Sequence, residues 1–156
     1  MRVPSWRGYP SPMEIQAKVL RPGAVVPRYA NEGDAGCDLV AISDCTLAAG
    51  GGRALLGTGM SIAIPEGYAG FVVPRSGLAA QHGVTCVNAP GIIDAGYRGE
   101  LRVALINHDP THEYVIRAGD RIAQLVLVPV AAAVFCVVEE LPAADRGAGG
   151  FGSTGR

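Results

Sequence analysis

The segment around the acidic residue Asp94 has the composition in this chain that most suggests a catalytic or binding site. Residues 88–100 read Asn-Ala-Pro-Gly-Ile-Ile-Asp-Ala-Gly-Tyr-Arg-Gly-Glu. The proline and glycines favour turns, whereas Ile92 and Ile93 favour extended backbone. We therefore predict two short strands joined by a tight turn. Their backbone N–H and C=O groups would be spaced to pair with a flat polar ring, and Tyr97 would add an aromatic face. Taken alone, the segment is equally compatible with an ordinary surface hairpin, because short motifs arise by chance.

A second segment, Pro-Arg-Ser-Gly-Leu-Ala at residues 74–79, has the composition of an anion-binding site. Arg75 is a permanent cation with a planar fork of donors that suits phosphate oxygens. Ser76 is a favourable helix N-cap, and Gly77 allows a ligand to approach the backbone. A short helix from Ser76 to about His82 would turn its N-terminus toward an anion. The competing interpretation is a capped helix beside a solvated arginine.

The C-terminal segment, residues 146–155, reads Arg-Gly-Ala-Gly-Gly-Phe-Gly-Ser-Thr-Gly. A flexible glycine linker would explain most of this composition. It would not explain Arg146 and Phe151. A mobile lid uses both, because the arginine can clamp phosphate and the phenyl ring can stack on a base.

Alternation of apolar and polar residues predicts the strands that must position these segments. We expect strands at residues 13–20, 53–56, 60–64, 68–73, 100–107 and 114–116, and two more within 122–138 that break near Pro129. Glycine, proline and aspartate clusters mark turns between them. The only helix expected is the short one at 76–82. Many short strands and one small helix predict an all-β sandwich or barrel.

Composition narrows the classes of partner. The 156 residues fit one domain, and a net charge of −1 with a pI of about 6.3 argues against a nucleic-acid surface. The four cysteines have no CxxC spacing, and no signal peptide precedes them, so we expect reduced thiols in a cytoplasmic protein. The apolar run 122–138 is short for a membrane span and rich in β-branched residues, so no membrane partner is expected.

Other chemistries find less support. His108 and His112 have the spacing of a metal pair, but Pro110 prevents the helix that would align them, so we expect a solvated turn. The GxxxxGK[ST] motif of a Walker loop is absent. No Cys/His cluster suits the catalytic zinc of nucleoside deaminases.

Five segments, in order, resemble the motifs of the trimeric dUTP pyrophosphatase (dUTPase) family. They are Asp-Ala-Gly-Cys-Asp-Leu at 34–39, residues 74–79, residues 88–100, Gly-Asp-Arg-Ile-Ala-Gln-Leu at 119–125, and residues 146–155. The resemblance implies a distorted jelly roll that hydrolyses dUTP to dUMP and pyrophosphate, which limits uracil incorporation into DNA and supplies dUMP for dTTP synthesis. It also implies a division into an N-terminal extension (1–12, disordered unless the true start is Met13), a β domain (13–141) and a flexible lid (142–156).

The resemblance also implies roles for single residues. Asp94 is the expected general base, which would deprotonate a water for in-line attack on the α-phosphorus. Non-terminal phosphates are assigned to Arg75, Ser76, Gly77 and Gln124. The γ-phosphate is assigned to the closed lid, through Arg146, Ser153 and Thr154, with Gly152 beside them.

The uracil base is assigned to the 88–94 segment. The Asn88 amide and the backbone of Gly91, Ile92, Ile93 and Asp94 would pair with its carbonyls and N3–H. Phe151 would cover the base, and Tyr97 would pack on the deoxyribose and exclude a 2′-hydroxyl. Arg102 occupies a position that touches the nucleotide in relatives, with no defined role here.

The charged triphosphate implies Mg²⁺, which binds mainly to phosphate oxygens and keeps several waters. Asp38 is the expected outer-sphere contact, through water, with no direct protein ligand. The resemblance further implies a homotrimer whose three subunits share each pocket. Apolar residues between Val126 and Val138 are candidates to line the threefold axis.

Two alternatives stay open. A dCTP deaminase of the same fold would carry a catalytic glutamate in the 88–100 region and lack the 146–155 segment, whereas this chain has Asp94 and that segment. A non-catalytic nucleotide-binding regulator would also be compatible with the fold. The intact Asp94 and Arg75 argue against it.

Overall fold

The described part of this computed structural model comprises residues 13–150, and its regular secondary structure is almost entirely β. It contains eleven strands and one helix. In chain order they are β1 (Gln16–Val19), β2 (Cys37–Val40), β3 (Cys45–Leu47), β4 (Arg53–Gly57), β5 (Met60–Ala63), β6 (Tyr68–Val73), α1 (Ser76–His82), β7 (Val84–Cys86), β8 (Gly91–Ile93), β9 (Arg102–Asn107), β10 (Tyr114–Ile116) and β11 (Arg121–Pro129). The all-β prediction is confirmed.

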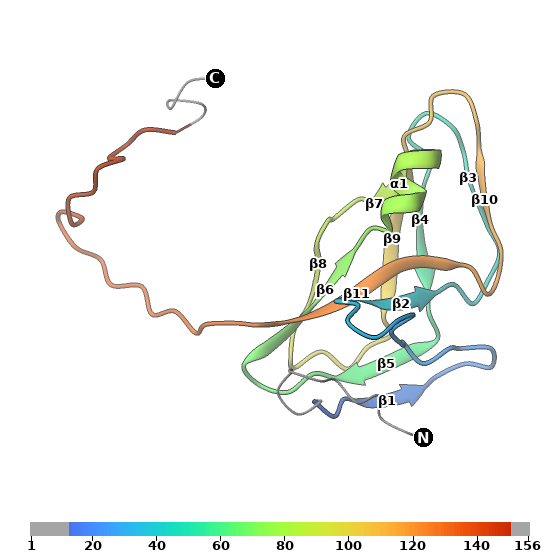
Figure 1. Ribbon diagram of the computed structural model, residues 1–156, viewed down its shortest axis with the longest axis horizontal. Coiled ribbons are helices and arrows are strands. Elements are labelled where there is room, and N and C mark those ends of the chain that lie inside the picture. The colour runs from blue at the N-terminus through green and yellow to red at the C-terminus, as the bar shows by residue number, and fades with distance from the viewer. Residues whose placement is uncertain (1–12, 151–156) are drawn as a thin grey trace.

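The strands pair antiparallel in four small sheets (Figure 1). The largest has the order β2-β11-β6-β8, and a three-stranded sheet has the order β4-β9-β7. Two further pairs, β1-β5 and β10-β3, complete the body. In the largest sheet Gln124 of β11 lies opposite both Asp38 of β2 and Val73 of β6. This register places polar residues from distant parts of the chain side by side.

The core lies between the two larger sheets. One buried cluster joins Leu39, Val72 and Leu125 of the four-stranded sheet to Val103 and Leu105 of the three-stranded sheet. Every second residue of β9 is buried, as expected for a strand with one face on the core. Burial of a large aliphatic side chain contributes roughly 1.5–3 kcal/mol, so this cluster is the main support for the segments that form the site.

Helix α1 has the predicted bounds, Ser76–His82, but its N-cap residue differs from the predicted one. Arg75 occupies the N-cap position without a side-chain capping bond, so the prediction of Ser76 as the N-cap was wrong. The helix ends at His82 and is capped by Gly83, which is in the left-handed conformation and donates its N–H to the carbonyls of Leu78 and Ala79. Leu78 is buried and fixes the helix to the core.

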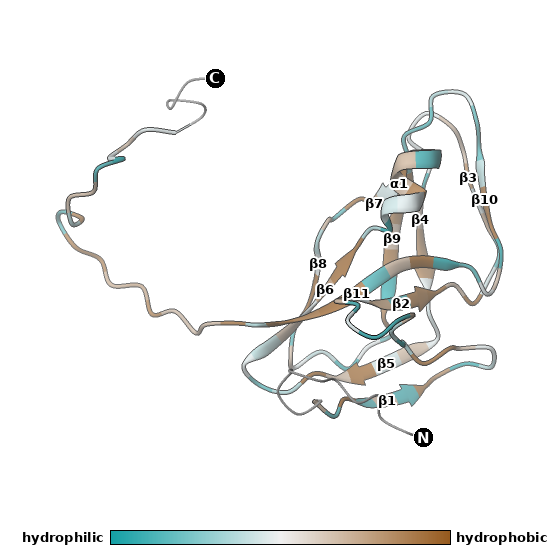
Figure 2. Cartoon of the chain, in the orientation of Figure 1, coloured by the Kyte–Doolittle hydropathy of each residue, from teal (hydrophilic) through white to brown (hydrophobic). Residues whose placement is uncertain are grey.

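The prediction of two strands within 122–138 was also wrong. One strand, β11, ends at Pro129, and the chain then leaves the body as an extended segment, in which apolar residues continue (Figures 1 and 2). Val134, Phe135 and Val137 are 89%, 93% and 101% exposed. These side chains have the apolar character of a strand but no facing strand within the described chain. No helix in residues 13–150 is long and apolar enough to cross a membrane.

The loop between β9 and β10 is organised by Asp109 and is a turn, as predicted. The Asp109 carboxylate accepts hydrogen bonds from the backbone N–H groups of Thr111 (2.9 Å) and His112 (2.8 Å). These bonds stabilise the ionised form and lower the pKa of Asp109 from 3.8 to about 2. Within the described residues, no group of three or more His, Cys, Asp or Glu side chains is placed to hold a metal ion.

The lowered pKa predicts how the contribution of Asp109 to stability depends on pH. Because the folded-state pKa lies below the unfolded value, the contribution is fully present above about pH 4 and is lost as the pH falls toward 2. We expect Asp109→Ala to unfold at a lower temperature than wild type at pH 7, with the difference shrinking between pH 4 and 2. Calorimetric or circular-dichroism melts of both proteins at each pH check this. An equal difference at pH 7 and pH 2 would contradict it.

Candidate active site

A surface pocket of about 380 Å³ gathers most of the predicted phosphate-binding residues. It lies where β2, β11 and the start of α1 meet the loop before β2. Its lining includes Asp38, Arg75, Ser76, Gly77 and Gln124, together with Arg121 and residues from the 30–36 loop. Three separate sequence segments, 30–38, 75–77 and 121–126, therefore meet at one place.

The Asp38 carboxylate is the centre of this pocket. One oxygen accepts a hydrogen bond from Gln124 Nε2 (3.3 Å) and lies 4.0 Å from Arg75 Nε. The other oxygen pairs with Arg121 Nη1 at 3.1 Å. The Asp38 side chain is only 11% exposed, whereas Arg75 and Arg121 stay partly accessible. One carboxylate thus orients two guanidinium groups and an amide, all of which can donate to phosphate oxygens.

Arg121 is a pocket residue that the sequence reasoning did not single out. Its backbone carbonyl also accepts a 2.7 Å hydrogen bond from Arg75 Nη1. Gln124 lies three positions after Arg121, and in a regular strand side chains at that spacing point to opposite faces. A register shift between Arg121 and Ala123 interrupts the regular alternation of side chains between the two faces of β11, so the side chains of both Arg121 and Gln124 reach Asp38. The sequence gives no local signal for such a bulge.

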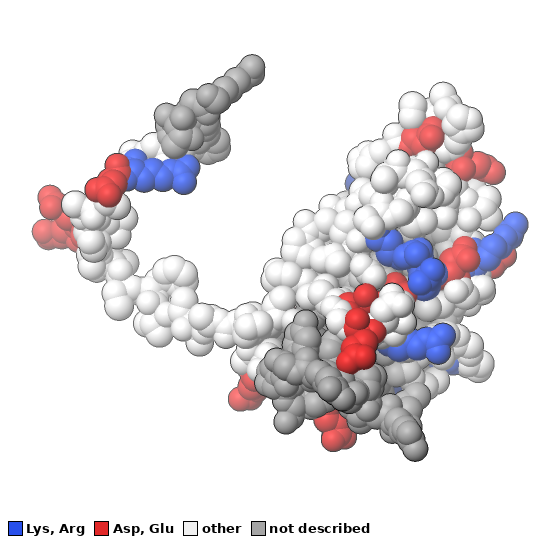
Figure 3. Space-filling model, viewed as in Figure 1, with Lys and Arg blue, Asp and Glu red and all other residues white. Residues whose placement is uncertain are grey.

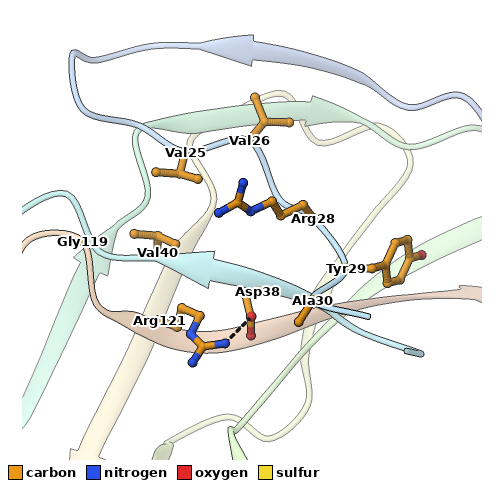
Figure 4. Close-up of a pocket in the computed structure, with 9 residues that line it drawn as sticks. All are labelled: Val25, Val26, Arg28, Tyr29, Ala30, Asp38, Val40, Gly119 and Arg121. Atoms are coloured by element: carbon orange, nitrogen blue, oxygen red, sulfur yellow. Dashed lines mark hydrogen bonds and ion pairs between the residues drawn. The ribbon is translucent and has the colours of Figure 1, made fainter. Parts of the chain in front are cut away.

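A second cavity, of about 580 Å³, adjoins the phosphate pocket and shares Asp38 and Arg121 with it (Figure 4). The Arg28 side chain extends into it, and its remaining walls include Val25, Val40 and Gly119. Figure 3 shows basic side chains over β2 and β11, with acidic ones beside them. Positive and negative side chains therefore lie together around these two cavities.

The segment around Asp94 differs from the predicted two-stranded hairpin. Its first half is strand β8, which pairs with β6, and β9 begins only at Arg102 and pairs with β4 and β7. The two strands therefore flank a turn without pairing with each other, and the prediction was wrong on this point. The turn itself is present, because the N–H of Tyr97 donates to the carbonyl of Asp94 (3.0 Å).

Asp94 is exposed at this turn, and none of the ion pairs found within residues 13–150 involves its carboxylate. Ile92 is 62% exposed on the outer face of β8, whereas Gly91 is buried. A Cβ atom at Gly91 would lie 3.0 Å from Asn88 Nδ2, so the Asn88 amide packs against this backbone. Arg102 pairs with Glu100 at 3.4 Å. The turn thus presents an acid, an amide and strand backbone at one edge of the sheet.

The structure does not bring every predicted residue into one pocket. None of the residues that line the phosphate pocket comes from the Asp94 turn, and β2 and β8 are the two opposite edge strands of their sheet. Arg146 lies in the extended C-terminal segment, where its Nε donates to the carbonyl of Gly149 (2.9 Å) in a local turn. Phe151, Gly152, Ser153 and Thr154 lie outside the described residues.

Fold and site together define a small all-β protein with a pocket of arginine and amide donors at one edge of its largest sheet and an acidic turn at the opposite edge. A sequence profile of the dUTPase family matches residues 23–155. The chain therefore belongs to the dUTPase family.

Curated relatives agree with this assignment. The chain is 55% identical over 143 residues to the deoxyuridine 5′-triphosphate nucleotidohydrolase of Thermobifida fusca, covering 92% of this chain and 79% of the relative. It is 58% identical over 130 residues to that of Leifsonia xyli subsp. xyli, covering 83% and 85%.

Solved structures show the same fold. A mutant dUTPase of Staphylococcus bacteriophage 80alpha with dUpNHpp superposes with a TM-score of 0.84 at 29% identity, covering 92% of this chain and 99% of that one. A mutant dUTPase of phage phi11 of S. aureus, described with a structural Mg(II) ion, has a TM-score of 0.76 at 27% identity, covering 82% and 98%.

Proposed function

We propose that this protein hydrolyses dUTP to dUMP and pyrophosphate. The observation that carries the proposal is the pocket around Asp38, in which Arg75, Gln124 and Arg121 are oriented by one carboxylate. Such a cluster of donors suits the oxygens of a polyphosphate chain. Sequence relatives named as deoxyuridine 5′-triphosphate nucleotidohydrolases support dUTP as the substrate.

Asp94 acts in this proposal as the general base. Its exposure leaves the carboxylate accessible to a water molecule, and the hydrogen bond from Tyr97 N to its carbonyl fixes the turn that carries it. A base must lie within hydrogen-bond reach of the proton that it removes. The carboxylate would take a proton from the attacking water as the water's oxygen forms a bond to the α-phosphorus and pyrophosphate leaves.

Base selection follows from hydrogen bonding along β8 and the Asn88 amide. Uracil presents two carbonyls and an N3–H, which backbone groups and one amide can match. Cytosine carries an amino group at C4 and lacks the N3 proton, so buried groups would be left unpaired. A site built on such bonds can discriminate by about 10⁴. A wall near C5 would likewise reject the methyl group of thymine.

Mg²⁺ would occupy the phosphate pocket bound to the triphosphate of the substrate. The two oxygens of Asp38 already accept hydrogen bonds from Gln124 and Arg121. These bonds disfavour direct coordination of the ion by Asp38 but leave lone pairs that can accept a hydrogen bond from a water molecule. Mg²⁺ retains several waters and prefers phosphate oxygens. Asp38 would hold the ion through water, and the ion would neutralise charge on the triphosphate.

A homotrimer with shared pockets explains why the site elements are separate on one chain. The phosphate pocket contains no residue of the Asp94 turn, and the C-terminal segment extends away from the body (Figure 1). Subunits related by a threefold axis could bring the phosphate pocket of one, the Asp94 turn of a second and the lid of a third together. The exposed apolar side chains Val134, Phe135 and Val137 would then contact a neighbouring subunit.

A side-by-side assay tests the proposed reaction. Pyrophosphate release is measured with dUTP, dCTP, dTTP and UTP, each with Mg²⁺, with EDTA, and after Mg²⁺ is restored. With Mg²⁺ we expect rapid pyrophosphate release from dUTP and not from the other three nucleotides. EDTA should abolish this activity, and restoring Mg²⁺ should recover it. Ammonia release from dCTP would support a deaminase instead, and binding of dUTP without turnover would support a regulator.

A further inference from the structure

The side chain of Tyr97 is tied to the residues that follow it. Its hydroxyl donates to the backbone carbonyl of Glu100 at 2.9 Å. A Cβ atom at Gly99 would overlap the Tyr97 ring, with three ring-side atoms at or within 3.0 Å. Gly99 is not among the glycines with positive φ, so the requirement there is for space rather than for backbone conformation. The hydroxyl end of the ring therefore lies against the backbone at residue 99 and is anchored by its hydrogen bond to Glu100.

Glu100 is in turn held by the body of the protein. Its side chain is only 10% exposed, and its Oε1 atom accepts a hydrogen bond from the N–H of Gly59 (2.9 Å). Its Oε2 atom pairs with Arg21 (3.3 Å) and Arg102 (3.4 Å). The ion pair gives Arg102 a defined partner, and the hydrogen bond from Gly59 connects Glu100 to the corner between β4 and β5.

Neighbouring backbone contacts strengthen the same connection. Leu101, which is fully buried, donates its N–H to the carbonyl of Met60 (2.7 Å), and Ser61 Oγ donates to the carbonyl of Arg98 (2.7 Å). The N–H of Tyr97 bonds to the carbonyl of Asp94. Residues 94–101 thus form one hydrogen-bonded unit that runs from the acidic turn, through the Tyr97 ring, to the β4–β5 corner.

We propose that Gly99 and Glu100 are positioning residues that set the orientation of the Tyr97 ring and thereby the preference for deoxyribose over ribose. The inference rests on the proposed function and on the role that the family resemblance implies for Tyr97, which is to pack on the deoxyribose. A ring whose hydroxyl is hydrogen-bonded and whose backbone N–H is also bonded has little freedom to move aside for a 2′-hydroxyl. A ring displaced by a methyl group at residue 99, or released from its carbonyl, would pack less closely and admit the extra oxygen.

The test compares kcat/KM for dUTP and UTP in Gly99→Ala, Tyr97→Phe and Glu100→Gln. The matched control is Gly96→Ala, because a Cβ atom at residue 96 would meet nothing within 4 Å. We expect Gly99→Ala to lower the ratio of dUTP to UTP efficiency by about tenfold or more, since small displacements of substrate-contacting groups carry large rate effects. Tyr97→Phe and Glu100→Gln should lower the same ratio, and Gly96→Ala should keep it.

Each result decides the proposal. A lowered ratio in Gly99→Ala with an unchanged ratio in Gly96→Ala supports it. If Gly99→Ala shows no cooperative thermal unfolding, Tyr97→Phe, which keeps the glycine, decides in its place. An unchanged ratio in the folded variants, even with lower activity on both substrates, would overturn the positioning role. Equal use of dUTP and UTP by the wild type would overturn the proposed sugar selection as well.

Discussion

Asp94→Asn should retain the fold and nucleotide binding but lose nearly all turnover. The amide has almost the shape of the carboxylate, so the exposed turn that carries it is preserved, but it cannot accept a proton from water. Loss of a general base typically costs 10²–10⁴ in rate. Steady-state pyrophosphate release gives the rate, and calorimetric titration with a non-hydrolysable dUTP analogue gives the affinity.

A matched control separates this effect from a general loss of charge. Glu113→Gln removes a negative charge from an exposed position in the loop between β9 and β10, away from the phosphate pocket, and should leave the rate unchanged. Turnover of Asp94→Asn within about tenfold of wild type would reject the assignment of the base.

Truncation after Asp145 should leave a folded protein that binds dUTP but turns it over at a rate reduced on the order of 10²-fold. The fold should survive because the hydrogen bonds described for residues 146–150 are local, such as that from Arg146 to Gly149. Turnover should fall because the proposed lid brings Arg146 and Phe151 to the substrate and excludes water, which strengthens the electrostatic contacts within the pocket.

The control for truncation is removal of Arg156 alone, which leaves the whole 146–155 segment in place. It should behave as wild type. If the longer truncation has unchanged steady-state rates, the segment is an idle linker and the lid assignment fails.

Local patterns in the sequence were enough to predict several elements of the fold. The strands Tyr68–Val73 and Tyr114–Ile116 and the helix Ser76–His82 have the predicted bounds, because turn residues punctuate apolar runs there. The meeting of Asp38, Arg75 and Gln124 in one pocket followed from the resemblance rather than from local pattern. It depends on strand pairing between segments more than 80 residues apart.

Other features depend on interactions that local patterns do not encode. The bulge that turns Arg121 toward Asp38 is a property of how β11 pairs with β2. Pairing of β8 with β6, rather than with the strand that follows it, likewise depends on the sheet as a whole. Beyond Pro129, the apolar residues predicted a second strand, but the described chain offers no strand for them to pair with. The apolar side chains beyond Pro129 contribute no hydrophobic stabilisation while they are exposed to water.

The shared pocket is the central claim, and one mixing experiment tests it most directly. Asp94→Asn and the truncation after Asp145 are each purified, denatured, mixed in equal amounts and refolded, with each variant refolded alone as the control. Dialysed products are assayed for pyrophosphate release from dUTP, and their mass in solution is measured. Shared pockets predict a trimeric mass and partial recovery of activity in the mixture, because some sites receive an intact Asp94 from one chain and an intact lid from another. A monomeric mass, or well-folded mixtures no more active than the separate variants, would contradict the shared-pocket account.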